Sequence, residues 1–129
     1  MSLLDYIVLT VAVYFIMIMV QVVAAWRSQS LSELAGPRDN MTDKGVFIGR
    51  CRRANHNMVE GMLMFFPLAF VALHINPVGA LALTGAALFV FARIVYAFLY
   101  WFGVPYLRTL AWIVSLLGLI LIFLQVLPV

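Results

Sequence analysis

Four long apolar segments alternate with short polar or turn-forming segments along the chain. The apolar segments cover about residues 5–26, 54–75, 78–101 and 106–127. Each is close to the ~20 residues that a helix needs to cross the hydrocarbon core of a bilayer. The connections leave no room for a separate soluble domain. The pattern therefore predicts an all-α integral membrane four-helix bundle that forms a single domain over residues 1–129.

The first apolar segment is a candidate signal peptide as well as a candidate span. No basic residue precedes it, and its apolar run is longer than the hydrophobic region of a signal peptide. We therefore expect a retained helix. A polar segment, 27–49, follows it. There Gly36-Pro37 predicts a turn, and Thr42-Asp43 predicts a cap for a second helix that begins before the membrane.

Two prolines predict local features of the helices, a kink in one helix and the start of another. Pro67 lies inside the second span, where it cannot donate to the carbonyl of Leu63, so a kink or local loosening is expected. Pro105 follows the chain break at Gly103 and is suited to the first turn of a helix. The fourth helix is therefore expected to begin close to Pro105.

Small residues recur at four-residue spacing in the first half of the third span. The pairs are Ala82 with Ala86 and Ala80 with Thr84. In membrane helices, small residues at this spacing allow two backbones to approach closely. Both pairs are therefore candidates for a close contact with a neighbouring helix.

A polar stripe interrupts the start of the second span. It comprises Arg50, Arg53, Asn57 and Glu60, whose spacing of three, four and three residues places them within roughly 80° of one another on a helix. Arg52 and His56 are expected to point elsewhere. A carboxylate near hydrocarbon costs a few kcal/mol unless it is paired. We therefore expect Glu60 to pair with an arginine, and the stripe to face the bundle interior or an aqueous site.

Two further sets of polar residues lie on the third and fourth spans. Arg93, Tyr96 and Tyr100 share one face of the third span, and an arginine inside a span indicates a functional site or a structural ion pair with Glu60. Arg108 and Thr109 lie in the first turn of the fourth helix. There the free N–H groups and the helix dipole already favour an anion. A cation at that position indicates an anion site or contact with a lipid phosphate.

Composition supports a membrane protein and excludes several kinds of site. Of the 129 residues, 66% are hydrophobic and only 10% are charged, whereas soluble domains carry about 25% charged residues. The single Cys51 excludes an internal disulfide. His and Cys residues lack metal-ligand spacing, so no metal site is expected. We also expect no nucleic-acid partner.

The positions of the basic residues predict the topology. The first connection and the helix that extends from it contain most of them, the third connection contains one, and the second contains none. The positive-inside rule therefore places the first and third connections in the cytoplasm and both termini outside the cell membrane. The polar residues then converge on the cytoplasmic half. They include Asn57, Glu60, Arg93 and Arg108. The basic residues of the first connection and its helix extension are Arg27, Arg38, Lys44, Arg50, Arg52 and Arg53.

Three motifs in this order resemble the MAPEG family, the membrane-associated proteins in eicosanoid and glutathione metabolism. They are R-x-x-R-A-x-x-N-x-x-E from Arg50 to Glu60, R-x-x-[HY]-x-x-x-Y from Arg93 to Tyr100, and P-x-x-R-[ST] from Pro105 to Thr109. The resemblance covers nearly the whole chain. The chain looks like a bacterial member that resembles microsomal glutathione transferases, which implies a bacterial inner-membrane protein.

The resemblance implies a homotrimer with a glutathione site at each protomer interface, toward the cytoplasm. It implies that Arg93 and Tyr100 hold glutathione, with Tyr96 beside them. Asn57 and Glu60 would engage the polar ends of the peptide, and Arg53 would be structural or adjacent to the ligand. Arg108 would lie at the glutathione sulfur, with Thr109 where some members have serine. The other partners would be lipids and a hydrophobic small-molecule substrate.

Three residues depart from the prostaglandin synthase branch of that family. Asn55 and Tyr96 replace histidines, and Trp112 replaces a tyrosine, which counts against prostaglandin chemistry. The first functional hypothesis is a transferase or peroxidase that uses glutathione as its co-substrate. The alternative is a non-catalytic lipid- or partner-binding protein of the same fold. A transporter or channel is disfavoured because the halves of the spans away from the arginines offer few polar residues.

Overall fold

The computed structural model describes residues 1–28, 34–37, 45–75 and 77–128. Within these ranges the chain forms four long helices and no strand, which confirms the predicted all-α fold. Each of the four is long and apolar enough to cross a membrane. The helices are α1 (Leu3–Ser28), α3 (Val46–Leu73), α4 (Ala80–Trp101) and α5 (Pro105–Val126).

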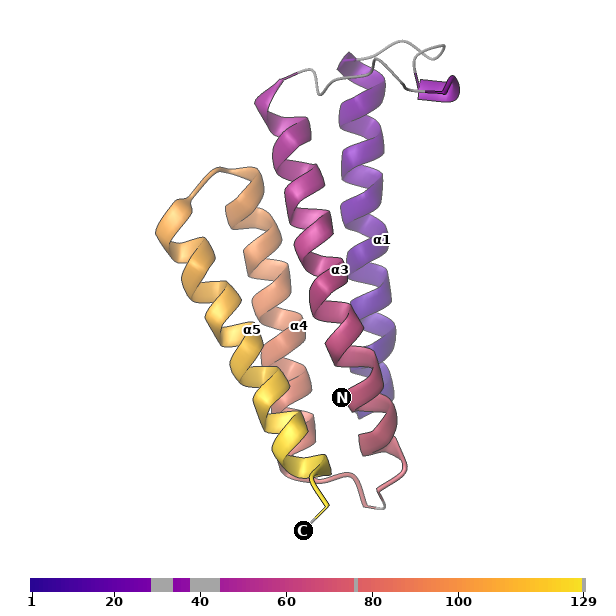
Figure 1. The fold of residues 1–129 in the computed structure, drawn as a ribbon, viewed down its shortest axis with the longest axis vertical. Coiled ribbons are helices and arrows are strands. Elements are labelled where there is room, and N and C mark those ends of the chain that lie inside the picture. The colour runs from indigo at the N-terminus through magenta and orange to yellow at the C-terminus, as the bar shows by residue number, and fades with distance from the viewer. Residues whose placement is uncertain (29–33, 38–44, 76, 129) are drawn as a thin grey trace.

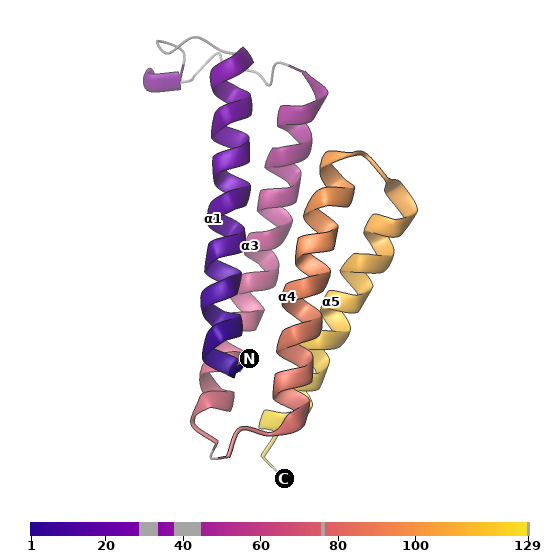
Figure 2. The same ribbon diagram turned by 180° about the vertical axis from the view of Figure 1, so that it is seen from behind.

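Successive long helices run in opposite directions (Figures 1 and 2). Helix α1 packs beside α3, and α4 makes its most extensive contact with α5. Both chain termini and the α3–α4 connection lie at one end of the bundle, which we call the terminal end. The last turns of α1 and α4 and the first turns of α3 and α5 lie toward the other end, which we call the polar end.

Local hydrogen bonds explain where α1 begins. The hydroxyl of Ser2 accepts a hydrogen bond from the backbone N–H of Asp5 at 3.2 Å, and the Asp5 carboxylate accepts one from the Ser2 backbone N–H at 2.6 Å. This reciprocal pair is a capping box. Helix α3 starts at Val46, well before residue 54, as the polar segment suggested. The cap predicted at Thr42 and Asp43 lies outside the described residues.

One of the two prolines lies inside a helix, and the other lies at a helix start. Helix α3 continues through Pro67, and the predicted kink there stays a prediction. Pro105 occupies the start of α5, as predicted. Before it, Gly103 has a φ of 72°, its N–H donates to the carbonyl of Tyr100 at 3.1 Å, and the next N–H, of Val104, donates to the carbonyl of Leu99 at 2.9 Å. This Schellman motif ends α4 and reverses the chain.

Two apolar clusters fill the interior. In the first, Phe65 of α3 and Phe89 of α4 stack with ring centroids 4.5 Å apart, and Ile122 of α5 packs with them. The second lies toward the polar end and contains buried residues of α1, α3 and α4, such as Met17 and Met58. Helix α5 contributes none of its described residues to the second cluster, so its first turn is left beside a polar region rather than inside a core.

Helices α4 and α5 approach each other closely where Gly85 of α4 meets Gly118 of α5. A Cβ atom on Gly85 would overlap the carbonyl oxygen of Gly118, and a Cβ atom on Gly118 would lie 2.8 Å from the backbone nitrogen of Phe89. The expected small pair Ala82 and Ala86 is buried, but Ala80 and Thr84 are exposed in this chain. The second small-residue pair is therefore not a contact within the protomer, and the two glycines form the actual crossing.

We expect Gly85→Ala and Gly118→Ala each to lower the free energy of unfolding by about 1–3 kcal/mol, because the added methyl group would push two backbones apart. Thermal unfolding of the purified protein in mild detergent measures the change. The control is Thr84→Ala, which alters an exposed neighbour on α4. Equal melting temperatures for Gly85→Ala and Thr84→Ala would contradict the close crossing.

Candidate functional site

A polar cleft opens between α3, α4 and the first turns of α5. It consists of two adjoining hollows of about 390 and 190 Å³ that share Asn57, Tyr96 and Tyr100 in their walls. We call the two hollows together the polar cleft. All the predicted site residues except Arg93 line it. The larger hollow is also lined by Arg52, Arg53, His56 and Glu60, and the smaller by Arg108, Thr109 and Trp112.

Arg93 lies behind the cleft rather than in its wall. Its side chain is buried, with 2% exposed, and its Nη1 donates a hydrogen bond to the Oδ1 of Asn57 at 2.5 Å. The guanidinium carbon lies 5.5 Å from the ring centroid of Phe89 and 5.4 Å from that of Tyr96. A ligand in the cleft would therefore meet the Asn57 amide, whose orientation Arg93 fixes, before it met the guanidinium.

Gly61 makes room for this buried arginine. A Cβ atom at Gly61 would lie 2.7 Å from the Nη2 of Arg93 and 3.1 Å from its Cζ. Any larger residue would displace the guanidinium from its place between the rings. The sequence pattern did not indicate this role, because the glycine lies on α3 and the arginine on α4, and periodicity within one helix cannot show such a contact.

Tyr100 is held between two arginines from different helices. The Nε of Arg53 on α3 donates a hydrogen bond to the Tyr100 hydroxyl at 3.1 Å. On α5, the guanidinium carbon of Arg108 lies 4.5 Å from the centroid of the Tyr100 ring, a cation–π contact. The ring of Tyr96 meets that of Tyr100 edge-on at 5.5 Å. The two tyrosines thus connect all three helices that form the cleft.

The first turn of α5 supplies a second source of positive potential beside Arg108. The N-cap residue, Val104, makes no side-chain capping hydrogen bond, so the first-turn N–H groups keep their donor capacity. These groups and the helix dipole favour an anion. The hydroxyl of Thr109 donates to the carbonyl of Pro105 at 3.3 Å, which leaves the hydroxyl oxygen as an acceptor toward the cleft.

The structure corrects the expectation that Glu60 pairs with an arginine. Its Oε1 lies 3.0 Å from the Nε2 of His56, one helical turn earlier, and both side chains are mostly exposed. Arg93, the arginine expected to reach Glu60, bonds to Asn57 instead. The expectation that Arg52 and His56 point away from the stripe is also wrong, because both line the larger hollow. The spacing of His56 and Glu60, four residues apart, was the available signal.

The charges around the cleft favour an anionic ligand that also carries one cationic group. Three arginines line it, Arg52, Arg53 and Arg108, against the single carboxylate of Glu60. Guanidinium groups bind carboxylates well because they offer several donors in one plane. Glu60 could in turn accept from an ammonium group. Among the described residues, no three His, Cys, Asp or Glu side chains gather as they would around a metal ion.

A buried amide pair ties α1 to α3 on the side away from the cleft. The Nδ2 of Asn55 donates to the Oε1 of Gln21 at 2.6 Å, and Asn55 is 7% exposed. In an apolar bundle such a pair fixes the register of two helices, because a shift would leave both amides without partners. Asn55 is adjacent in sequence to residues of the cleft wall, so this contact also fixes the rotation of α3.

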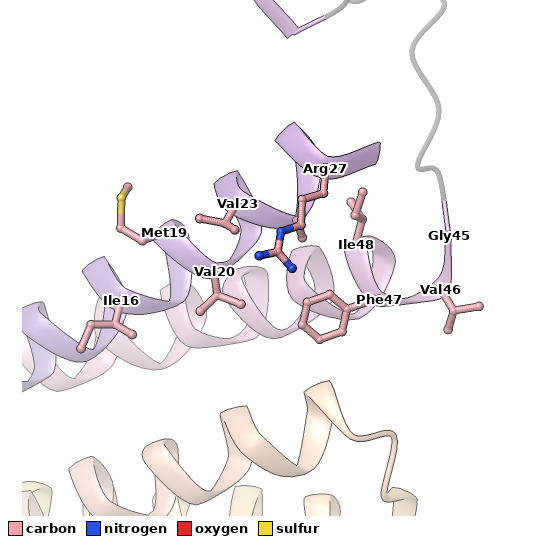
Figure 3. Close-up of a pocket in the computed structure, with 10 residues that line it drawn as sticks. Ile16, Met19, Val20, Val23, Arg27, Gly45, Val46, Phe47 and Ile48 are labelled. Carbon is pink, nitrogen blue, oxygen red and sulfur yellow. The ribbon is translucent and has the colours of Figure 1, made fainter. Parts of the chain in front are cut away.

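Apolar grooves cover two outer faces of the bundle. One, of about 620 Å³, lies between α1 and α3, where Figure 3 shows Ile16, Val20 and Phe47 along it and the guanidinium of Arg27 turned toward it at the polar end. The other, of about 500 Å³, lies between α4 and α5 and is lined by residues such as Phe91 and Leu110. Such surfaces suit hydrocarbon chains.

Comparison with known proteins matches nearly the whole chain to one protein family. The family model described as the MAPEG family matches residues 3–128. No curated protein and no solved structure gives a significant match. The match covers all four long helices and every residue of the polar cleft.

We expect Arg93→Met to lower the free energy of unfolding by about 1.5–3 kcal/mol, because Asn57 would lose a charge-assisted hydrogen bond inside the bundle. Thermal unfolding in mild detergent measures the loss. Glu60→Ala is the matched control. Among the described residues, Glu60 forms an ion pair with the exposed His56 alone, so we expect a change within about 1 kcal/mol. A larger loss for Glu60→Ala than for Arg93→Met would reverse the assignment of the buried and exposed polar residues.

Proposed function

Since the chain belongs to the MAPEG family, we propose that it is a membrane glutathione transferase or peroxidase acting on hydrophobic electrophiles or lipid hydroperoxides. One observation carries the proposal. Arg108 lies at the N-terminus of α5 and faces the cleft, and among the described residues it contacts the ring of Tyr100 and no carboxylate. Its charge therefore remains available to an anion, and a thiolate is the anion that this chemistry requires.

Arg108 and the N-terminus of α5 can together supply the thiolate stabilisation that this chemistry requires. A free thiol has a pKa of about 8.5, so only a few per cent of it is ionised at neutral pH. Lowering the pKa of bound glutathione to about 6.5 requires about 2.7 kcal/mol of thiolate stabilisation. A guanidinium and a helix N-terminus acting together in a partly dry cleft can supply an effect of this order.

The remaining cleft residues match the other groups of glutathione. Its carboxylates suit Arg53 of the larger hollow, and its ammonium group suits Glu60. The amide of Asn57 can bond to the peptide backbone. Tyr96 and Tyr100 lie between the two hollows, so a peptide held in the larger hollow could direct its thiol past them into the smaller one, toward Arg108 and Thr109.

Both proposed reactions start from the same thiolate. In the transferase reaction, the sulfur forms a bond to an electrophilic carbon, and a leaving group departs or the product takes up a proton. In the peroxidase reaction, two glutathione molecules are oxidised to the disulfide while a hydroperoxide is reduced to an alcohol and water. The hydrophobic substrate would arrive from the bilayer along the apolar outer faces.

We also propose that the cleft faces the bacterial cytoplasm and that both termini lie outside it. Of the six arginines among the described residues, five lie in the last turn of α1 or the first turns of α3 and α5, which form the polar end, the sixth, Arg93, lies within α4, and none lies at the terminal end. The positive-inside rule favours the cytoplasm for the basic end. Glutathione supplied from the cytoplasm would then reach the cleft directly. The described arginines at that end are Arg27, Arg50, Arg52, Arg53 and Arg108.

We propose that the protein is a homotrimer, because the polar cleft is open on one side and Glu60 is exposed at a depth where a neighbour would shield it from lipid. Native mass spectrometry from mild detergent should therefore show three copies. A stable monomer that still binds glutathione would rule out the trimer as a requirement for the site.

The sharpest prediction concerns Arg108. We expect Arg108→Ala to reduce turnover by at least about 10-fold while glutathione affinity changes much less, because its charge acts on the thiolate rather than on the peptide. Ultraviolet absorbance of bound glutathione at neutral pH distinguishes thiolate from thiol. Calorimetric titration measures affinity in the same samples, and a model transferase substrate reports turnover.

Asn57→Ala is the matched variant with the opposite expectation, since it removes a group that would bond to the peptide. It should weaken glutathione binding and leave a thiolate signal at saturation. Full thiolate absorbance in Arg108→Ala would transfer that role to Thr109 and the helix N-terminus. Binding without any thiolate in the natural protein would favour the alternative, a non-catalytic lipid- or partner-binding member of the family.

A further inference from the structure

Arg50 belongs to the polar stripe by its spacing, but it does not line the polar cleft. Its Nη1 donates a hydrogen bond to the backbone carbonyl of Trp101, the last residue of α4, at 3.4 Å. The last four carbonyls of a helix have no partner within it, and the dipole makes that end negative. A guanidinium from α3 therefore satisfies one of these carbonyls and complements the dipole of α4.

Arg50 also packs directly on the turn that joins α4 to α5. A Cβ atom on Gly103 would lie 2.6 Å from the Nη2 of Arg50 and 2.7 Å from its Cζ. Gly103 has a φ of 72°, which residues with a side chain rarely adopt. The backbone conformation therefore favours glycine at this position, and a larger residue would also have to displace the Arg50 guanidinium.

This turn determines where α5 begins. Pro105 comes two residues after Gly103, and Arg108 lies within the first turns that follow. The contact of Arg108 with Tyr100 spans the same turn, because Tyr100 lies in the last turn of α4. A change in the turn would therefore move the Arg108 guanidinium on α5 relative to Asn57 on α3 and Tyr96 on α4.

We propose that Arg50 is a positioning residue that clamps the α4–α5 turn onto α3 and so sets the place of Arg108 in the polar cleft. The inference rests on the proposed function for its chemical consequence. Its structural part, the coupling of Arg50 to Gly103, stands independently of any ligand. Neither residue touches the cleft, so their effect on a bound thiol must pass through the turn.

A double-mutant cycle tests the clamp without ligand. We expect Arg50→Ala and Gly103→Ala each to lower the melting temperature in detergent by at least about 4 °C. The double variant should fall by clearly less than the two shifts added together, since the clash of the new methyl group requires the arginine. Gly45→Ala is the matched control. Gly45 also has a positive φ, of 95°, but its Cβ would meet nothing within 4 Å, so its combination with Arg50→Ala should be additive.

The second measurement tests the consequence for chemistry. We expect Arg50→Ala to bind glutathione within about 3-fold of the natural protein, while the thiolate absorbance of bound glutathione falls at least about 3-fold. Arg50→Lys keeps a charge and one donor near the Trp101 carbonyl, so it should recover part of the signal. A residue that only supported global stability would not separate binding from ionisation in this way.

The two measurements test different parts of the proposal, and each can contradict its own part. Additive melting shifts for Arg50 and Gly103 would overturn the clamp, whatever glutathione does. Coupled melting shifts with an unchanged thiolate signal would overturn the placement of Arg108 by Arg50. Absence of glutathione binding in the natural protein would reject the proposed function and the chemical part of the inference, and the melting cycle would still decide the structural part.

Discussion

The arrangement of the helices around the polar cleft depends on one buried contact, the hydrogen bond from Arg93 to Asn57. A guanidinium inside a membrane bundle is costly unless partners surround it. Here one amide, two aromatic rings and the space left by Gly61 accommodate it, and the Arg93 Nε is left without a hydrogen-bond partner among the described residues. Because these partners come from both α3 and α4, satisfying the charge fixes how the two helices face one another. The wall of the polar cleft is a consequence of that constraint.

Much of the fold could be predicted from the sequence, because it follows from properties of single segments. Four apolar runs predicted four helices, and Pro105 predicted the start of α5, which the structure confirms. The early start of α3 was also indicated by the polar segment. The crossing at Gly85 and Gly118 was not found, since small residues occur on several faces and only the packed helices show which face meets a neighbour. Ala80 and Thr84 had the same spacing and are exposed.

The sequence could predict which residues line the polar cleft, but it could not predict all the contacts between their side chains. Spacing placed Asn57 and Glu60 on one face of a helix, and both line the polar cleft. Spacing within α3 did offer His56 as a partner for Glu60, but it could not show that Arg93 reaches Asn57 rather than Glu60, because that choice depends on the depth of each side chain and on the rotation of α4 against α3. Long side chains add to this limit, since Arg52 reaches the larger hollow from beside the stripe.

The position of Arg108 shows how a charge can be held without being neutralised. A cation in the first turns of a helix is unfavourable by about 0.3–1 kcal/mol because it opposes the dipole. Contact with the Tyr100 ring contributes about 0.5–2 kcal/mol in the other direction. The two effects roughly cancel, so the guanidinium is kept in place by an aromatic face that leaves its charge intact. A carboxylate partner would hold it as firmly but would remove the positive potential that an anion in the smaller hollow needs.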